Sequence, residues 1–157
     1  MSTGAWIAVG AVALALVVGL WRLATDGRFR GTHVVRGDAG VADGGSTAEA
    51  GPADAPAGAE LVAAVGEQLG DRATLLQFSS AFCAPCRATR RVLSEVTDLV
   101  EGVRHVEVDA EHHLDATRAF GILRTPTTVV LDASGAEVTR ATGAPSRDQV
   151  LSALAQV

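Results

Sequence analysis

Several residue types are scarce or absent in this chain of 157 residues, and each shortage excludes something. There is no lysine, so every basic side chain is an arginine, a bias that resembles the coding preference of a GC-rich bacterium. Aromatic residues make up 4% and the net charge is −5, which gives no reason to expect nucleic-acid binding. With only two cysteines, the chain cannot build a four-cysteine zinc site. The chemistry of those cysteines therefore depends on their immediate surroundings.

Cys83 and Cys86 stand in a Cys-x-x-Cys pattern between two regular segments. The apolar run 73–79 predicts a buried strand, and apolar residues at helical spacing after Ala84 predict an amphipathic helix. Pro85 falls in the first turn of that helix, where its missing N–H has no effect. Cys83 is thus expected at the helix start, where free N–H groups and the helix dipole stabilise a thiolate. Because the thiolate attacks disulfides, the pattern favours dithiol–disulfide exchange.

Other interpretations of the cysteine pair remain open. A zinc site would need His112 and His113 as further ligands, but adjacent helical side chains point roughly 100° apart. A structural disulfide would close a very short loop and would restrain the unfolded chain little. We interpret the pair as a redox-active disulfide that uses no metal and no other cofactor.

From Glu60 to Val157 the order of these motifs resembles the thioredoxin family. The resemblance is carried by the strand before the cysteines, the turn that contains them, and the segments 106–109, 120–127, 128–131 and Gly143. It implies an α/β fold with a mixed four- to five-stranded sheet flanked by helices. It also implies a cis Pro126 that faces the cysteines, and a substrate-binding surface formed by Phe82, Ala84, Pro85, Thr125 and Pro126.

Two positions depart from the pattern of that family. Gln77 stands where relatives usually carry a buried acid, and an amide cannot take up a proton at neutral pH. His105 stands near the position of a common lysine, and the ordinary pKa of histidine, about 6.5, would suit a base. Both residues are candidates for proton transfer, and we favour the alternative for His105 that it is a partly exposed strand residue.

The N-terminal segment differs from the rest of the chain because residues 1–21 carry no charged side chain. With Trp6 and Trp21 near its ends, this segment predicts a transmembrane anchor over residues 1–23. Its apolar stretch, 5–20, is nevertheless shorter than the roughly 20 residues of a usual span. A cleavable signal peptide is the alternative, but the basic start and the small-residue cleavage site that it needs are not found.

The arginines that follow the anchor favour a redox domain on the cytoplasmic face of a cell membrane, with an extracytoplasmic location as the alternative. Residues 24–59 are rich in Gly, Ala, Asp, Ser and Pro, and they predict a flexible linker. Residues 60–157 then form one thioredoxin-like domain. Because no first strand is visible in its sequence, a sheet of four strands is the simpler expectation.

Together these features predict a thiol-disulfide oxidoreductase. We expect it to act as a monomer that reduces disulfides of partner proteins near the membrane, supplied by an unidentified electron donor. Two other functions remain open: an extracytoplasmic oxidase or isomerase, and a module that holds a metal or a thiol-bearing partner without turnover.

Overall fold

The apolar run before the cysteines forms the central strand of the sheet in a computed structural model, which describes residues 3–25, 27–31 and 55–157. This strand, β2 (Ala73–Ser79), is buried along its whole length. It pairs in parallel with β3 (Val103–Asp109) and antiparallel with β4 (Thr127–Asp132). Neighbouring strands cover both of its edges and helices cover both faces, so its apolar side chains and its polar ones, Thr74, Gln77 and Ser79, are all buried.

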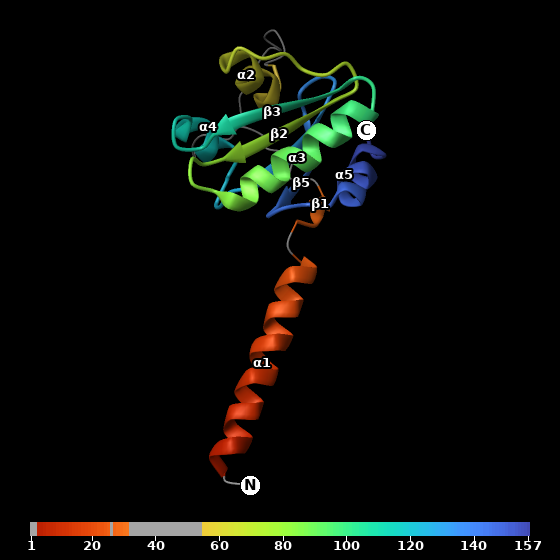
Figure 1. Cartoon of the computed structure of the whole chain (residues 1–157). Coiled ribbons are helices and arrows are strands. Elements are labelled where there is room, and N and C mark those ends of the chain that lie inside the picture. Colours follow the sequence, from red (N-terminus) through yellow and green to blue (C-terminus); the bar gives the residue numbers. More distant parts are fainter. Residues whose placement is uncertain (1–2, 26, 32–54) are drawn as a thin grey trace, which may run out of the picture.

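The sheet continues from β4 through a hairpin to β5 (Glu137–Thr142), and its order is β1-β5-β4-β2-β3 (Figure 1). In the hairpin turn, Asp132 Oδ1 accepts hydrogen bonds from the backbone N–H groups of Ser134 and Ala136. The sequence of residues 132–135, Asp-Ala-Ser-Gly, predicts a hairpin turn, and the structure confirms it. Asp132 satisfies two donors that the reversal of the chain would otherwise leave without partners.

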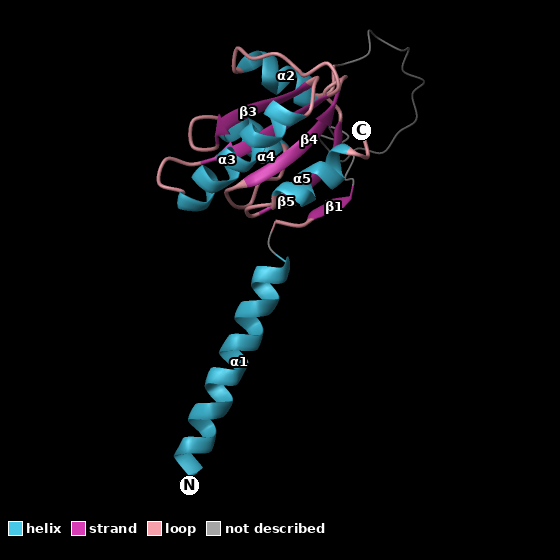
Figure 2. Ribbon diagram, turned by 45° about the vertical axis from the view of Figure 1, so that its right-hand side comes forward, coloured by secondary structure: helices cyan, strands magenta, loops and turns pink. Residues whose placement is uncertain are grey.

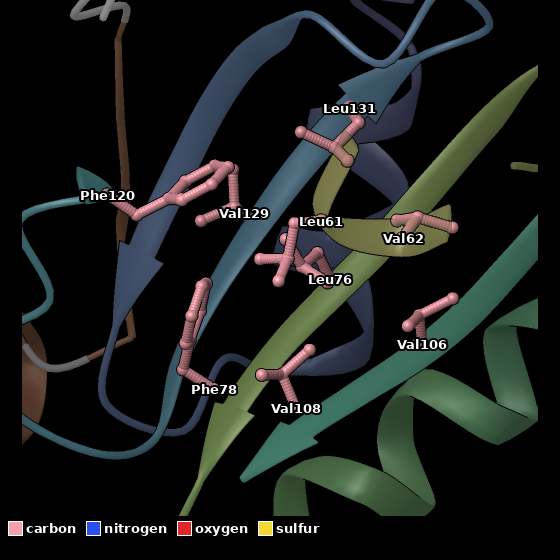
Figure 3. Packing of buried hydrophobic residues seen from close by; sticks show 9 residues of the cluster. All are labelled: Leu61, Val62, Leu76, Phe78, Val106, Val108, Phe120, Val129 and Leu131. Atoms are coloured by element: carbon pink, nitrogen blue, oxygen red, sulfur yellow. The ribbon is translucent and has the colours of Figure 1, made fainter. Parts of the chain in front are cut away.

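Helices cover both faces of the sheet (Figure 2). Between the helices and the sheet lie two clusters of buried side chains, one on each face. On one face lie α3 (Ala84–Leu99) and α5 (Arg147–Leu154), which bury residues such as Leu93 and Val150. On the other face lie α2 (Ala57–Ala64) and α4 (Leu114–Ala119). The cluster on that second face is drawn in Figure 3 and comprises Leu61, Val62, Leu76, Phe78, Val106, Val108, Phe120, Val129 and Leu131. This arrangement is the α/β fold that the sequence predicts.

The first strand of the sheet lies in a segment that the sequence assigned to the linker. Residues Phe29–Gly31 form β1 and pair antiparallel with β5, so the sheet has five strands rather than four. The assignment of residues 24–59 to a linker is thus wrong at this point. Such a short edge strand has no alternating pattern of its own, and its partner, β5, lies more than a hundred residues further along the chain. Residues 32–54 of the predicted linker lie outside the described residues.

The amphipathic pattern of residues 60–69 predicts a helix that ends at Gly70, but both boundaries differ in the structure. The helix expected over 60–69 begins earlier, at Ala57, and ends at Ala64. Gly66 adopts a φ of +78°, and the next N–H, of Glu67, bonds to the carbonyl of Val62. Gly66 rather than Gly70 therefore ends the helix, because a glycine takes up this left-handed conformation without strain. The sequence also predicts that Ser146 caps the final helix, and the structure confirms this, since the Ser146 side chain and Gln149 form a reciprocal cap.

The N-terminal segment forms one long helix, α1 (Thr3–Thr25), which projects away from the sheet (Figure 1). Large apolar side chains on it, such as Leu14 and Leu20, are 65% and 73% exposed. Among the described residues, however, no helix combines the length and the apolar character that crossing a membrane requires. The transmembrane anchor predicted over residues 1–23 is therefore not supported. The physical reason is the short apolar stretch, which Arg22 ends after Trp21.

Candidate active site

The two cysteines form a disulfide at the point where β2 leads into α3. Their Cα atoms are 5.2 Å apart. Cys83 is the residue that caps the N-terminus of α3, with Pro85 in the first turn as predicted. The backbone N–H of Cys86 points at Cys83 Sγ over an N···S distance of 3.1 Å. A donor aimed at this sulfur favours its negatively charged form once the disulfide is reduced.

The two sulfur-bearing residues differ in accessibility. Cys86, in the first turn of α3, is 1% exposed, whereas Cys83 is half-buried. A partner disulfide can therefore approach Cys83 but not Cys86. This asymmetry assigns different chemical steps to the two residues, because exchange requires the attacking sulfur to reach a sulfur of the partner.

Gln77 and His105, the two candidates for proton transfer, lie together beneath the cysteines. Gln77 is completely buried, and its Nε2 donates a hydrogen bond of 3.1 Å to the carbonyl oxygen of Cys86. Its Oε1 lies 3.1 Å from Nε2 of His105 on the neighbouring strand. Burial lowers the pKa of His105, against an opposing effect of the Glu107 carboxylate. The ring of His105 is thus neutral at neutral pH.

Beside the disulfide lies a polar cleft of about 390 Å³. It is lined by Ser79, Ser80, Ala81, Cys83, Cys86, Arg87, Arg90, Glu107 and Asp109. Arg90 and Glu107 form an ion pair of 2.6 Å across it. Burial opposes the ionisation of Glu107, but hydrogen bonds from Arg90 and Ser79 outweigh that effect and hold its pKa below the usual value. The sequence prediction missed this carboxylate, although its position two residues after His105 on the same strand could have indicated it.

The five residues predicted to bind substrate are not equally accessible. Phe82 is 98% exposed, and Ala84 and Pro85 are also exposed. Thr125 is half-buried and Pro126 is buried; the peptide bond between them is cis, as predicted. The Ser80 and Thr125 hydroxyls lie 3.2 Å apart, so the loop before Cys83 contacts the segment before Pro126. A further apolar side chain, Leu123, was not predicted and is 97% exposed.

A metal site does not form from the residues that were considered as ligands. Within the described part of the chain, no group of three or more His, Cys, Asp or Glu side chains is arranged to hold a metal ion. His112 instead pairs with Asp109, its Nδ1 lying 2.9 Å from the carboxylate. The cysteines are joined to each other, and the structure therefore offers a dithiol–disulfide pair rather than a set of metal ligands.

Comparison with known proteins agrees with this geometry. Residues 61–157 match the sequence model of a family described as thioredoxin-like domain. Thioredoxin of Alicyclobacillus acidocaldarius is 30% identical over 89 residues, which cover 56% of this chain and 84% of that protein. Thioredoxin of Mycoplasma genitalium is 29% identical over 77 residues, which cover 49% of this chain and 74% of that protein.

Solved structures share the fold at lower identity. Thioredoxin of Fasciola hepatica has a TM-score of 0.50 at 21% identity, covering 62% of this chain and 88% of that one. A chloroplastic thioredoxin z has a TM-score of 0.51 at 22% identity, covering 62% of this chain and 85% of that one. At such identities the similarity shows the arrangement of helices and strands alone.

Proposed function

The chain belongs to the thioredoxin family and is a thiol-disulfide oxidoreductase, and from this premise we propose that it reduces disulfides of partner proteins close to a membrane. The observation that carries the proposal is the asymmetric disulfide at the start of α3. Its outer sulfur belongs to a half-buried residue and receives a backbone N–H, while its inner sulfur belongs to a fully buried one. This arrangement suits exchange in two steps with a large partner.

In the first step, the thiolate of Cys83 attacks one sulfur of the partner disulfide. A bond forms between that sulfur and Cys83 Sγ, and the other partner sulfur leaves as a thiolate, which takes up a proton. In the second step, Cys86 loses its proton and attacks Cys83 Sγ. The disulfide between Cys83 and Cys86 forms, the partner leaves as a dithiol, and two electrons have passed to it. A dithiol donor must then reduce the enzyme again.

The partner would dock on the exposed rim around Cys83. Phe82 and Leu123 are 98% and 97% exposed, and both are large apolar side chains. Exposed apolar side chains on the loops of an active site suit contact with a partner protein. Thr125 and Pro126 lie next to this rim through the hydrogen bond between Thr125 and Ser80. The segment of the partner that carries the partner's disulfide would lie in an extended conformation across these residues. This chain would act as a monomer, and its other surfaces would not contact the partner.

The membrane would be reached through α1. This helix exposes apolar side chains on every side, with Trp6 and Trp21 near its two ends, and lipid would cover that surface. The domain would lie on the cytoplasmic face, because Arg22 and Arg28 next to the apolar stretch would meet the anionic lipids of that leaflet. A reporter protein fused after Val157 shows on which side of the membrane the domain lies in cells. We expect activity from a reporter that works only in the cytoplasm; activity from a reporter that works only outside it would contradict this location.

Vesicles of phosphatidylcholine and phosphatidylglycerol test the contact with lipid. The whole chain should sediment with them, and Leu14→Glu together with Leu16→Glu should release it. Leu99→Glu is the matched control, since Leu99 is an exposed leucine of similar accessibility outside α1. If the double variant sediments as well as the control does, α1 does not attach the chain to lipid.

The direction of electron flow is tested by two measurements on the whole chain. It should catalyse the reduction of insulin by dithiothreitol, and its reduction potential should lie near the reducing values of thioredoxins, about −270 mV. Failure to reduce insulin would contradict catalytic turnover and favour a binding module. A potential near the oxidising range, about −120 mV, would favour the oxidase or isomerase instead.

A further inference from the structure

The hydrogen bonds beneath the active site fix which atoms carry protons there. The amide nitrogen of Gln77 donates to the carbonyl oxygen of Cys86, so the amide oxygen must face His105. An amide oxygen accepts hydrogen bonds and cannot donate them. Nε2 of His105 therefore carries a hydrogen in both the neutral and the protonated ring, and Nδ1 is the atom that titrates.

This assignment excludes a simple proton path from Cys86 to His105. The path would end at a nitrogen that already carries its hydrogen, and it would pass through an amide group that does not titrate. The charged groups near the ring do not change this conclusion. Glu107 on the same strand and Arg90 on α3 act on the imidazole in opposite directions, and neither alters which nitrogen faces Gln77.

The same hydrogen bonds have a second consequence, for the position of Cys86. The carbonyl of Cys86 is held by Gln77, while its N–H points at Cys83 Sγ. Displacement of the first turn of α3 would thus move the N–H away from the attacking sulfur. Two other buried polar residues do not hold this turn in place through a hydrogen bond. The hydroxyls of Thr89 and Thr128 have no hydrogen-bond partner among the described residues.

We propose that Gln77 and His105 form an uncharged strut beneath α3 that positions Cys86 so that its backbone N–H stabilises the thiolate of Cys83. His105 orients the amide of Gln77, Gln77 holds the carbonyl of Cys86, and the N–H of Cys86 acts on the sulfur. Both are positioning residues, and neither exchanges a proton with the cysteines. This inference rests on the proposed function, since it concerns the sulfur that attacks the partner.

The test is the rate at which iodoacetamide alkylates Cys83 in the reduced whole chain, measured between pH 5 and 9 and located by mass spectrometry. Gln77→Met keeps the size of the side chain but removes its hydrogen bonds. We expect alkylation of this variant at pH 7 to be roughly fivefold slower, because the hydrogen bond from the Cys86 N–H to the Cys83 thiolate is weakened or lost. The curve of alkylation rate against pH should shift to higher pH. Thr74→Val is the matched control, since it removes a buried hydrogen bond of β2 to Gly70 that lies outside the active site.

A second variant keeps the test independent of the folding of Gln77→Met. His105 is only half-buried, and His105→Leu should slow alkylation roughly twofold, because Gln77 keeps its bond to Cys86 but loses the partner that orients it. The double variant should be no slower than Gln77→Met alone, since the two residues act through one contact.

Three results would contradict the proposal that Gln77 and His105 position Cys86. They are unchanged alkylation in both single variants, additive losses in the double variant, and rescue of His105→Leu by added imidazole, which would show that the ring transfers protons. Failure of the proposed function would look different: the unmodified chain would not reduce insulin, whatever the rates of alkylation in the variants.

Discussion

Two helices of this protein, α1 and α3, place their apolar side chains in opposite ways. In α3, Leu93 and Val96 are fully buried against the sheet, and the polar face carries residues such as Arg90. In α1, the large apolar side chains between Trp6 and Trp21 are exposed, with values from 46% for Val18 to 73% for Leu20. Both helices carry large apolar side chains, but among the described residues those of α3 are covered by the sheet whereas those of α1 are not covered.

This difference explains why the function of one helix can be inferred more directly than that of the other. The sheet fixes α3, and the fixed helix places Cys83 and Cys86 at its N-terminus. The role of α1 depends on a surface outside the chain, and lipid is our proposal for it. The following predictions test this contrast, from the largest expected effect to the smallest.

The largest effect should come from removing a sulfur at the start of α3. Cys83→Ser should reduce insulin-disulfide turnover to the uncatalysed rate, because no thiolate remains to attack. Ala88→Ser, on an exposed position of the same helix, should keep the rate of the unmodified chain. The assay is the precipitation of insulin in the presence of dithiothreitol. Substantial turnover by Cys83→Ser would mean that the chemistry lies elsewhere.

Truncation of one leucine in each helix compares their contributions to stability. Leu93→Ala should lower the free energy of unfolding by about 2–5 kcal/mol, since it leaves a cavity between α3 and the sheet. Leu14→Ala should change it by less than about 0.5 kcal/mol in water, because this side chain is already solvated. Urea unfolding measures both. Equal decreases in the free energy of unfolding for the two variants would show that α1 packs against the domain, as α3 does.

The strut beneath α3 should give the protein a stability that depends on pH. Burial holds the pKa of His105 below its ordinary value of 6.5, so the unfolded chain takes up a proton there before the folded chain does. The contribution of the neutral His105 ring to the free energy of unfolding is therefore complete above pH 6.5, and it is lost as the pH falls through the lower pKa of the folded state. The unfolding temperature of the unmodified chain should fall over this window more than that of His105→Gln. Parallel curves would contradict the burial of a neutral ring.

The smallest effect should come from the ion pair on the polar side of α3. Arg90 is largely exposed and Glu107 only partly buried, so solvent screens their attraction. Glu107→Gln should lower the free energy of unfolding by no more than about 1 kcal/mol at neutral pH, and less in high salt. The matched comparison is Asp115→Asn, which removes the exposed pair with Arg118. A loss of several kcal/mol for Glu107→Gln would mean that the pair is shielded from water.

Much of the domain could be predicted because local patterns coincide with what the fold requires. The apolar run 73–79 becomes a strand buried on both faces, and the capping pattern at Ser146 begins the final helix. Cys83 and Cys86 were placed correctly since strand, proline and helix all constrain the same short turn. These features depend on contacts between residues that are close in the sequence.

The features that were missed depend on distant contacts. The strand Phe29–Gly31 exists because β5 pairs with it, and three residues carry too little pattern to show this. The hydrogen bonds between Gln77, Cys86 and His105 join three elements, so the sequence suggested the residues but not their arrangement. The cleft carboxylate of Glu107 was missed for the same reason, because its nearness to the disulfide follows from the parallel pairing of β2 and β3.

The assignment of the attacking sulfur can be tested most directly by trapping a partner on the whole chain. Cys86→Ser and Cys83→Ser, each reduced, are mixed with insulin, and the intact mass is measured without a reductant. We predict a mixed disulfide on Cys83 in the Cys86→Ser chain, released by dithiothreitol, and none in the Cys83→Ser chain. A mixed disulfide that forms equally in both chains, or in Cys83→Ser alone, would contradict the account.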